Sequence, residues 1–526
     1  MKRILTLLLA LTMLFALAAC GGSGTGSQPS AGNSGDSGSS GDTGSSSDSG
    51  DSGETGAPSD GEYPVVRFAY THMFAVSSEA AIEEEMNKIL REKCNAEIDL
   101  VAIDFSNMQQ QFNLLLTGGS DSIDIFSSFW YMPYNTLKSN GQLADMTDLL
   151  EAHPEVLEIF AEYPEVLECC KIDGRYYALP TYGAYSSPMV YLAMKEDSDA
   201  ANIDWSKVKT LNDATDAMLA MKEANPTHYY IPGATETYYV PKDIDYLGDT
   251  NFLGVLTKPL ESTTVENYYE SDYFLNFMEQ VRIWQANDLI VPDPMSNTNP
   301  TLMSMQFGLC SGTPGYSFDA DEFCYEANLQ QQYGGDVTGV NLGERLITTG
   351  NITTYLWHIT SFCKQKDVAM DVLAAFYTEP ELCNLLGNGI EGENYVVLED
   401  GTLAFPEGKD MTNCGWTGLG ASYSLPNCSE CTPWYYQPAD YWQLLWDSNK
   451  DAKPSLALGF AFNAEPVADQ VTACGNVISQ YYLPLINGEV NIDEVLPVFQ
   501  QALHDAGIDA IIAEKQAQLD AWLASK

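Results

Sequence analysis

Aromatic side chains are the residues of this chain best suited to contact a ligand directly. The 526 residues include 9 Trp, 30 Tyr and 20 Phe, and four of the tryptophans fall between Trp416 and Trp446. Flat rings stack on the apolar faces of a neutral ligand, while polar groups beside them bind its edges. The stretch from Trp416 to Tyr441 is also rich in Gly and Pro, which predicts a long loop. Its rings, Trp434 and Tyr435 among them, either line a ligand cleft or pack against C-terminal helices.

Trp130 and Tyr131 are candidates for a different reason, because they follow a predicted strand. Strands and helices are expected to alternate before them, over residues 65–70, 78–94, 96–103, 107–117 and 123–126. This β-α-β-α-β order favours a mainly parallel sheet with helices on both faces. Ligands of such sheets bind beyond the carboxyl ends of the strands, which is where Trp130 and Tyr131 are expected.

A hairpin and a proline predict a boundary in the middle of the chain. Asp173 and Gly174 lie between short apolar-containing runs, a strong signal for a two-residue turn. Pro180 then ends the second run, because proline lacks a backbone donor and fixes φ. We predict a hinge between two α/β lobes at this point. Tyr182, just beyond it, is a candidate ligand contact.

The N-terminal residues predict export and anchoring rather than a folded domain. Lys2 and Arg3 precede an apolar run too short for a transmembrane span, and small residues lead to Cys20. Residues 1–20 resemble a lipoprotein signal peptide with a lipobox, which implies lipid on Cys20; a secreted protein that pairs Cys20 in a disulfide is the alternative. Residues 21–62 are a Ser/Gly/Asp tether, expected to be disordered with a span of roughly 35 Å. Such a tether suggests a Gram-positive cell surface.

Charge and cysteine usage exclude several classes of function. The formal net charge of −49 makes nucleic acids and anionic surfaces poor partners, although acidity also keeps an exported protein soluble. The lone C-x-x-C motif, Cys428 with Cys431, and five histidines do not complete a zinc site. We predict no metal and no cofactor; free thiols and one or two disulfides both remain open. No carboxylate pair stands out among 73 acidic residues and no nucleophile motif occurs, so an enzyme is not predicted.

Several segments, taken in order, resemble a known family. They are residues 141–150 (GQLADMTDLL), 173–180 (DGRYYALP), 189–195 (MVYLAMK) and 303–313 (MSMQFGLCSGT). Behind a lipobox and a tether, they resemble the family 1 extracellular solute-binding proteins of ABC importers, the group of the maltose-binding protein. Residues 389–395 (GIEGENY), 459–462 (GFAF) and 482–488 (YLPLING) resemble a subfamily with an additional C-terminal domain of unknown function.

The resemblance implies a two-lobed, periplasmic-binding-protein-like α/β fold with mainly parallel sheets flanked by helices. The hinge is expected to have about three crossovers, and extra helices are expected at the C-terminus. Residues 63–180 and about 345–388 would form lobe one. Residues 181–344 and about 389–526 would form lobe two with the C-terminal extension.

The resemblance also adds candidate ligand contacts. Tyr316 follows the segment at 303–313, where the family often carries an aromatic sugar contact. Trp357 lies on an expected return strand and could equally belong to the core. Glu391 lies in a glycine-flanked turn, where it either accepts hydroxyl hydrogen bonds or caps the adjoining structure. Of Phe460 and Phe462, one is expected to face the cleft and the other the core.

The function that the resemblance implies is capture of a small solute for import. We expect a lipid-anchored, monomeric receptor on the extracellular face of the cell membrane, which closes two lobes on its ligand and delivers it to an ABC permease. An oligosaccharide is the expected ligand because the chain has many aromatic side chains that can stack on the faces of sugar rings. A peptide or another organic solute is the alternative ligand. A surface glycan-capture protein without a transporter is the alternative function.

Overall fold

The computed structural model describes residues 63–526, apart from residues 73, 130, 187, 234–240, 249–250, 298–302, 317–334 and 417–424. The predicted signal peptide, the lipidation site Cys20, the tether and Trp130 lie outside the described residues. The described chain builds hydrophobic cores around two separate β-sheets, which we call the first and second lobes.

The first lobe contains a five-stranded sheet in the order β2-β1-β3-β11-β6. Its strands are β1 (Val65–His72), β2 (Glu97–Asp104), β3 (Ile125–Ser128), β6 (Leu179–Pro180) and β11 (Leu356–Ile359). Parallel pairing joins β2, β1 and β3, whereas β11 pairs antiparallel with β3 and β6. The parallel β-α-β-α-β unit predicted from the sequence is therefore confirmed for the first three strands.

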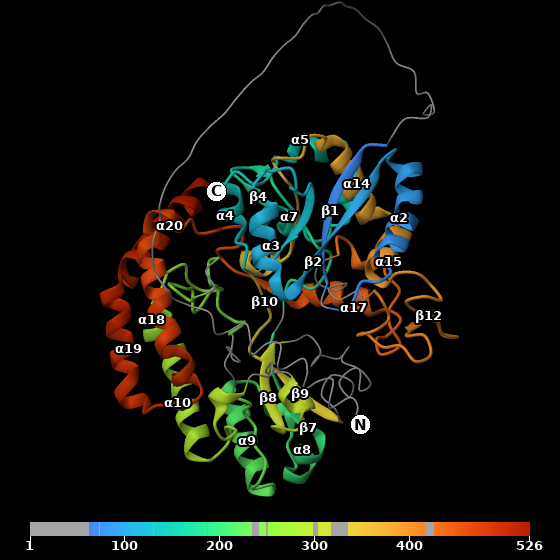
Figure 1. The fold of residues 1–526 in the computed structure, drawn as a ribbon. Coiled ribbons are helices and arrows are strands. Elements are labelled where there is room, and N and C mark those ends of the chain that lie inside the picture. The colour runs from blue at the N-terminus through green and yellow to red at the C-terminus, as the bar shows by residue number, and fades with distance from the viewer. Residues whose placement is uncertain are drawn as a thin grey trace, which may run out of the picture. The chain divides into compact units, whose positions relative to one another are not determined.

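Helices and short hairpins complete the first lobe. The helices are α2 (Glu79–Lys93), α3 (Met108–Leu115), α4 (Tyr134–Ser139), α5 (Thr147–Leu150), α6 (Pro154–Glu158), α7 (Pro164–Cys169), α13 (Thr349–Ile352), α14 (Lys366–Thr378), α15 (Pro380–Asn388) and α17 (Tyr441–Asp447). The hairpins are β4 (Lys171–Ile172) with β5 (Arg175–Tyr176), and β12 (Val396–Val397) with β13 (Leu403–Ala404). Alternate β1 residues enter different cores, since Phe68 packs with α2 and α14 while Ala69 packs with α3, which places helices on both faces (Figure 1).

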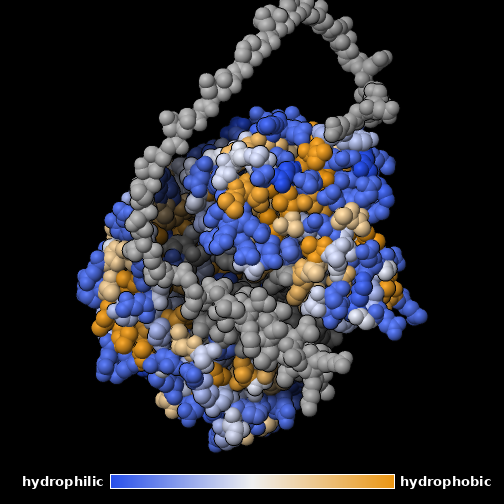
Figure 2. All heavy atoms as spheres, viewed as in Figure 1, coloured by the Kyte–Doolittle hydropathy of each residue, from blue (hydrophilic) through white to orange (hydrophobic). Residues whose placement is uncertain are grey.

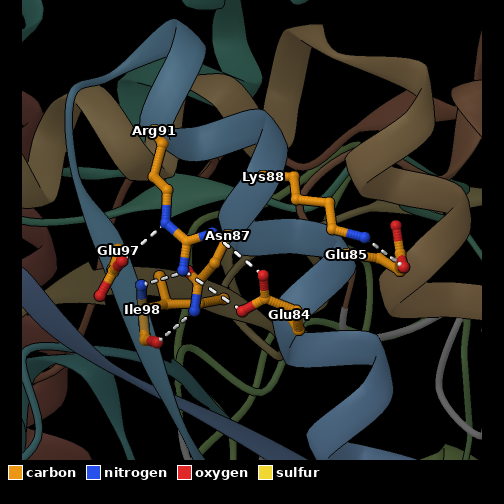
Figure 3. Close-up of polar contacts among 7 residues, drawn as sticks. All are labelled: Glu84, Glu85, Asn87, Lys88, Arg91, Glu97 and Ile98. Carbon is orange, nitrogen blue, oxygen red and sulfur yellow. Dashed lines mark hydrogen bonds and ion pairs between the residues drawn. The ribbon is translucent and has the colours of Figure 1, made fainter.

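One buried amide fixes the position of α2 on the sheet. Asn87 donates to the carbonyl of Ile98 at 3.0 Å and accepts from its N–H at 2.7 Å, while only 5% of its surface is exposed (Figure 3). Arg91 adds ion pairs to Glu84 at 3.1 Å and to Glu97 at 2.6 Å. Exposed ion pairs contribute about 0–1 kcal/mol each, so the buried Asn87 contact specifies the register of α2 on β2 more strongly.

The Asp-Gly hairpin forms as the sequence predicts. Lys171 pairs with Tyr176 and Ile172 pairs with Arg175, so the turn has two residues. Both turn residues have positive φ, 54° at Asp173 and 77° at Gly174, as a type I′ turn requires.

The second lobe contains a three-stranded sheet in the order β8-β7-β9. Its strands are β7 (Met189–Met194), β8 (Gly312–Tyr316) and β9 (Val337–Leu342). Both neighbours pair antiparallel with β7, so the expectation of mainly parallel sheets is wrong for this lobe. The direction of a strand depends on the end at which the chain re-enters the sheet, and the residue pattern of one strand does not contain this information.

The second lobe also contains most of the long helices. The helices of this lobe are α8 (Lys195–Ala201), α9 (Leu211–Ala224), α10 (Asp272–Ala286), α11 (Met303–Gln306), α18 (Ala468–Ile486), α19 (Ile492–Ala506) and α20 (Ile508–Ser525). Short 3-10 turns, counted over both lobes, are η1 (Phe105–Asn107), η2 (Trp205–Lys207), η3 (Tyr268–Glu270), η4 (Pro294–Ser296), η6 (Cys428–Glu430), η7 (Ser448–Asp451) and η8 (Glu465–Val467).

Helices α18, α19 and α20 pack side by side on the second-lobe core, as predicted for the extra C-terminal helices (Figure 1). Asn491 caps α19 by accepting from the N–H of Asp493 at 3.1 Å. Gly507, with φ at 100°, turns the chain from α19 into α20. A Cβ at this position would lie 2.7 Å from Cγ of Gln470, so the turn requires glycine on both conformational and steric grounds.

The predicted return to the second lobe near residue 389 is wrong. The aromatic region from Trp416 onward packs in the first-lobe core with β1, α2 and α14. Its buried members there are Trp416, Leu425, Cys428, Cys431, Tyr441, Trp442, Leu445 and Trp446. The chain stays in the first lobe until about residue 450. The buried rings of this region therefore pack in the first-lobe core and not against the C-terminal helices.

The ten cysteines within the described residues are free thiols. Cys428 and Cys431 lie in the first-lobe core, where burial raises the pKa of both thiols. The C-x-x-C motif therefore contributes to packing in this structure.

A buried histidine links three elements of the first lobe. Nδ1–H of His358 donates to the carbonyl of Tyr177 at 2.9 Å, and Nε2 accepts from the hydroxyl of Ser128 at 2.9 Å. Burial lowers the pKa of His358 from 6.5 to about 4. The ring is therefore neutral near pH 7 and joins β11, β3 and the segment after the hairpin.

We expect this histidine to make the protein less stable in mild acid. Between pH 6.5 and 4 the unfolded chain binds a proton on His358 that the folded chain does not bind. The free energy of unfolding should then decrease by up to about 3 kcal/mol as the pH is lowered from 6.5 to 4. Urea unfolding of the wild type and of His358→Gln across this range measures the effect. The stability advantage of the wild type should shrink as the pH falls, and a constant difference would contradict the assignment.

Candidate functional site

The chain passes between the lobes three times, and hydrogen bonds join the crossings to one another. The second crossing ends in β10 (Leu346–Ile347) and the third contains β14 (Lys453–Pro454), and these two strands pair in parallel. The N–H of Lys453 donates to the carbonyl of Arg345 at 3.0 Å, and the N–H of Ser455 donates to that of Ile347 at 2.9 Å. The predicted three crossovers are present, and two of them form a ribbon.

Arg345 joins this ribbon to the first crossing, residues 181–188. Its Nη1 donates to the carbonyl of Ser186 at 3.3 Å. Burial lowers the pKa of Arg345, and the Asp451 carboxylate on the third crossing opposes this shift. A guanidinium stays charged even so, because its pKa in water is far above 7. One side chain of the second crossing thus interacts with both other crossings.

The first crossing also packs closely on the first lobe. The amide of Asn449 accepts from the N–H of Tyr185 at 2.7 Å and donates to the carbonyl of Gly183 at 2.9 Å. The ring of Tyr182 stacks on Trp446, with centroids 4.2 Å apart and planes 9° apart. Tyr182 is 8% exposed. Its face is therefore used in packing the crossing, rather than being offered to a ligand as the sequence suggested.

Asp245 attaches the third crossing to the second lobe. Its carboxylate is fully buried and accepts from the hydroxyl of Ser455 at 2.5 Å and from the N–H of Leu247 at 2.9 Å. Burial raises the pKa of Asp245, whereas these hydrogen bonds and the positive charge of Lys515 lower it. Buried polar side chains thus hold the third crossing at both ends, Asn449 at the first lobe and Asp245 at the second.

The loop after β3 carries aromatic side chains at the carboxyl end of the sheet, as predicted. Tyr131 is partly exposed and stacks on Phe129 with planes 9° apart and centroids 6.1 Å apart. Tyr355, which precedes β11, meets Phe129 edge-on at 5.7 Å. Burial raises the pKa of Tyr131, so its hydroxyl stays protonated and can donate. Trp130, the neighbouring prediction, lies outside the described residues.

A second set of rings reaches the surface beside the hairpin of β12 and β13; we call Phe405, Trp434, Tyr435 and Tyr436 the surface aromatic group. Tyr435 is 49% exposed, and Trp434 packs on Phe405 with centroids 4.4 Å apart. Nε1 of Trp434 donates to Oδ1 of Asn388 at 3.1 Å, and the N–H of Tyr435 donates to the carbonyl of Leu403 at 2.8 Å. The indole and the backbone of this group are therefore both anchored.

Three other predicted contacts are buried core residues. Trp357 is 1% exposed and packs on Phe68, Trp416 is 2% exposed and packs on Tyr70, and Phe462 is 8% exposed in the second-lobe core. Phe460 is buried with Phe462, so the expectation that one of them faces a cleft is wrong. The segment around them has no strand geometry, and alternate residues are therefore not obliged to point to opposite sides.

Glu391 is exposed on a turn that the N–H of Gly392 closes by donating to the carbonyl of Tyr395 at 2.7 Å. Its neighbours carry the tertiary contacts. Glu393 accepts from the hydroxyl of Ser78 at 2.6 Å, and Asn394 donates to the carbonyl of Cys414 at 2.9 Å. The turn at 389–395 therefore joins the start of α2 to the aromatic region, and Glu391 itself stays free for solvent or ligand. Tyr316 contributes its backbone to β8, and its side chain lies outside the described part.

No group of three or more His, Cys, Asp or Glu side chains in the described residues is arranged to hold a metal ion. Figure 2 shows hydrophilic residues over most of the face in view, with apolar residues in separate small groups. One such group lies over α19, where Val498 is 53% exposed.

Sequence reasoning missed the residues that organise the crossings. Arg345, Asn449 and Asp245 belong to no recognised motif, and each acts through a partner far away in the sequence. The one available signal is the scarcity of basic residues, because 24 Lys and Arg stand against 73 Asp and Glu. An isolated arginine after a strand in such a chain is a reasonable candidate for a structural or binding role.

Comparison with known proteins gives matches along most of the chain. Residues 76–303 match the model of a bacterial extracellular solute-binding protein family, and residues 456–524 match a domain of unknown function, DUF3502. A carbohydrate ABC transporter substrate-binding protein of Streptococcus pneumoniae serotype 4 is 23% identical over 487 residues, which cover 89% of this chain and 93% of that protein.

Several solved structures have a similar fold. The N-glycan transport solute binding protein NgtS of Streptococcus pneumoniae superimposes with a TM-score of 0.75 at 20% identity, over 88% of this chain and 99% of that chain. The alginate-binding protein AlgQ2 gives a TM-score of 0.56 at 15% identity over the same shares. An HMO-binding solute-binding protein from Bifidobacterium longum infantis gives a TM-score of 0.57 at 16% identity, over 88% of this chain and 99% of that chain. These likenesses support the two-lobed fold.

The aromatic region provides a matched pair of substitutions that separates core rings from surface rings. Trp416→Ala removes a buried ring and should lower the free energy of unfolding by about 3–5 kcal/mol. Tyr435→Ala removes a half-exposed ring and should change it by about 0.5 kcal/mol or less. Chemical denaturation of both variants beside the wild type tests the assignment. Equal losses would show that the two rings do not differ as described.

Proposed function

We propose that this chain, whose residues 76–303 match the bacterial extracellular solute-binding proteins, captures an oligosaccharide and delivers it to an ABC importer. The proposal starts from one observation: two lobes with separate cores are joined by three mutually bonded crossings. A ligand held between such lobes can be enclosed when they close, since the crossings keep the lobes paired while bending. Closure would remove the ligand from water and create the form that a permease recognises.

Two observations favour an oligosaccharide as the ligand: the chain has many aromatic side chains, and the similar proteins have names that refer to carbohydrates. A sugar presents flat C–H faces and hydroxyls at its edges, which suit aromatic rings with adjacent polar groups. Tyr131 at the carboxyl end of β3 and Tyr435 in the surface aromatic group meet this description. The similar proteins carry names that refer to carbohydrate, N-glycan, alginate and HMO. Trp130, Tyr316, Trp434 and Glu391 remain proposed contacts, whereas the burial of Tyr182, Trp357, Trp416 and Phe462 argues against that role.

The location proposed for the protein is the extracellular face of the membrane. The lipobox-like sequence supports lipid on Cys20, and residues 21–62 would then hold the lobes away from the membrane. No helix in the described residues is long and apolar enough to cross a membrane. We further propose that the receptor is a monomer and has no catalytic activity of its own.

Ligand binding should be measurable by thermal stability. A glycan panel that includes Man5GlcNAc, with which the pneumococcal NgtS was crystallised, should contain at least one stabilising ligand. At a hundred times its dissociation constant, a ligand adds about 2.7 kcal/mol to the free energy of unfolding. A panel of short peptides serves as the control and should have no effect. Stabilisation by peptides alone would overturn the choice of an oligosaccharide.

The position of the ligand can be tested with single ring removals. Trp130→Ala and Tyr131→Ala should each weaken binding of the identified glycan about tenfold by calorimetry, as expected for loss of a stacking partner worth about 1.4 kcal/mol. Tyr435→Ala should weaken binding only if the glycan reaches the surface aromatic group. If the first two variants bind like the wild type, the loop after β3 does not contact the ligand.

A further inference from the structure

One face of α20 contacts the end of the third crossing almost residue by residue. We call residues 458–463 the strap. The contacting side chains are Lys515, Gln518 and Trp522 of α20 and Lys526, which directly follows the helix. They are spaced three or four residues apart and therefore lie along one stripe.

The contacts along this stripe reach both ends of the strap. Lys526 donates from Nζ to the carbonyl of Leu458 at 3.1 Å. Trp522 meets Phe460 edge-on with centroids 5.8 Å apart. Its ring also fills the space beside Gly459, where an added Cβ would lie 3.2 Å from Cζ2 of Trp522. Gly459 also has a φ of 94°, which other residues rarely adopt, so the backbone conformation favours glycine at this position.

Gln518 makes the most specific of these contacts. Its Oε1 accepts from the N–H of Asn463 at 2.9 Å, and its Nε2 donates to the carbonyl of Asn463 at 2.9 Å. The side-chain amide thus pairs with both backbone groups of one residue, as a neighbouring strand would. Lys515, one turn earlier, lies with Nζ 4.9 Å from the centre of the Phe462 ring.

The strap also contacts the first lobe. The N–H of Gly459 donates to the hydroxyl of Thr349 on α13 at 2.7 Å. Nδ2 of Asn135 on α4 donates to the carbonyl of Phe462 at 3.4 Å. Both α4 and α13 belong to the first lobe, whereas α20 packs on the second. The strap is therefore held between the C-terminal helix and the first lobe.

We propose that α20 positions the strap and thereby sets how readily the two lobes close, which gives the C-terminal domain of unknown function a role in closure. Any change in the angle between the lobes alters the contacts of the strap with Thr349 and Asn135. The contacts of Trp522 with Gly459 and of Gln518 with Asn463 oppose such a change. Gln518 and Trp522 act as positioning residues that influence affinity through the strap. This proposal rests on the lobe closure assigned under the proposed function.

The helix offers its own matched control. Gln516, two residues from Gln518, also pairs with backbone groups, since it accepts from the N–H of Val265 at 2.7 Å and donates to the carbonyl of Thr263 at 3.2 Å. Those groups lie within the second lobe. Gln518→Met and Gln516→Met each remove one such clamp while keeping a side chain of similar length and helix propensity.

Hydrogen exchange on the intact, unliganded chain provides the first measurement. Gln518→Met should speed exchange of the Asn463 amide about tenfold, as expected for the loss of one hydrogen bond. It should also speed exchange at Gly459, whose partner is in the first lobe. Gln516→Met should speed exchange at Val265 and leave Gly459 unchanged. Unchanged exchange at Gly459 in Gln518→Met, or equal acceleration in both variants, would overturn the proposal.

Small-angle scattering and ligand affinity complete the test. The scattering profile of unliganded Gln518→Met should differ from that of the wild type, whereas that of Gln516→Met should match it. With Man5GlcNAc as the probe, only Gln518→Met should change the dissociation constant. If this glycan does not bind, the glycan identified in the panel replaces it as the probe, and exchange and scattering decide the role of α20 without any ligand. Identical scattering in all three proteins would reject a role in closure.

Discussion

The structure depends on satisfying backbone polar groups where the chain leaves one core and enters another. A crossing cannot rely on the sheet of either lobe for its hydrogen bonds, and an unpaired buried group costs about 1–3 kcal/mol. The chain meets this requirement by pairing β10 with β14 and by placing Asn449 and Arg345 against the first crossing. Because the crossings bind one another, they form a single connected unit. This unit determines which relative movements of the lobes keep their hydrogen bonds.

The same requirement accounts for the long aromatic region of the first lobe. The ring of Trp446 stacks on Tyr182 at the start of the first crossing. Asn449, three residues after Trp446, donates to the carbonyl of Gly183 in the same crossing. The rings between Trp416 and Trp446 extend the first-lobe core up to this point. Large buried rings contribute much of the apolar burial in a core, so they make a firm base for the crossings. The rings that remain at the surface, such as Tyr435, are those with room for another role.

The sequence predicts local features of this fold better than long-range ones. The alternation of strands and helices through β3 and the two-residue hairpin turn at Asp173 and Gly174 depend on neighbouring residues, and both are confirmed. The point at which the chain returns to the second lobe and the direction of the strands in the second sheet depend on distant partners. The predicted return at residue 389 and the predicted parallel sheet were both wrong. Candidate contacts were hard to rank because a tryptophan has the same chemistry in a core as in a cleft. Trp357 and Trp416 are distinguished from Tyr435 only by burial, which a single sequence does not contain.

An added domain affects a two-state movement only if its contacts differ between the states. The contacts described for α18 and α19 stay within the second lobe, so a rigid rotation of that lobe leaves them unchanged. The contacts of α20 with the strap are different in kind. The strap is hydrogen-bonded to Thr349 and Asn135 of the first lobe, so a rotation of the first lobe against the second changes the contacts of the strap. Within residues 456–524, the strap therefore makes the contacts with the first lobe, α20 holds the strap, and α18 and α19 pack with α20 on the second-lobe core.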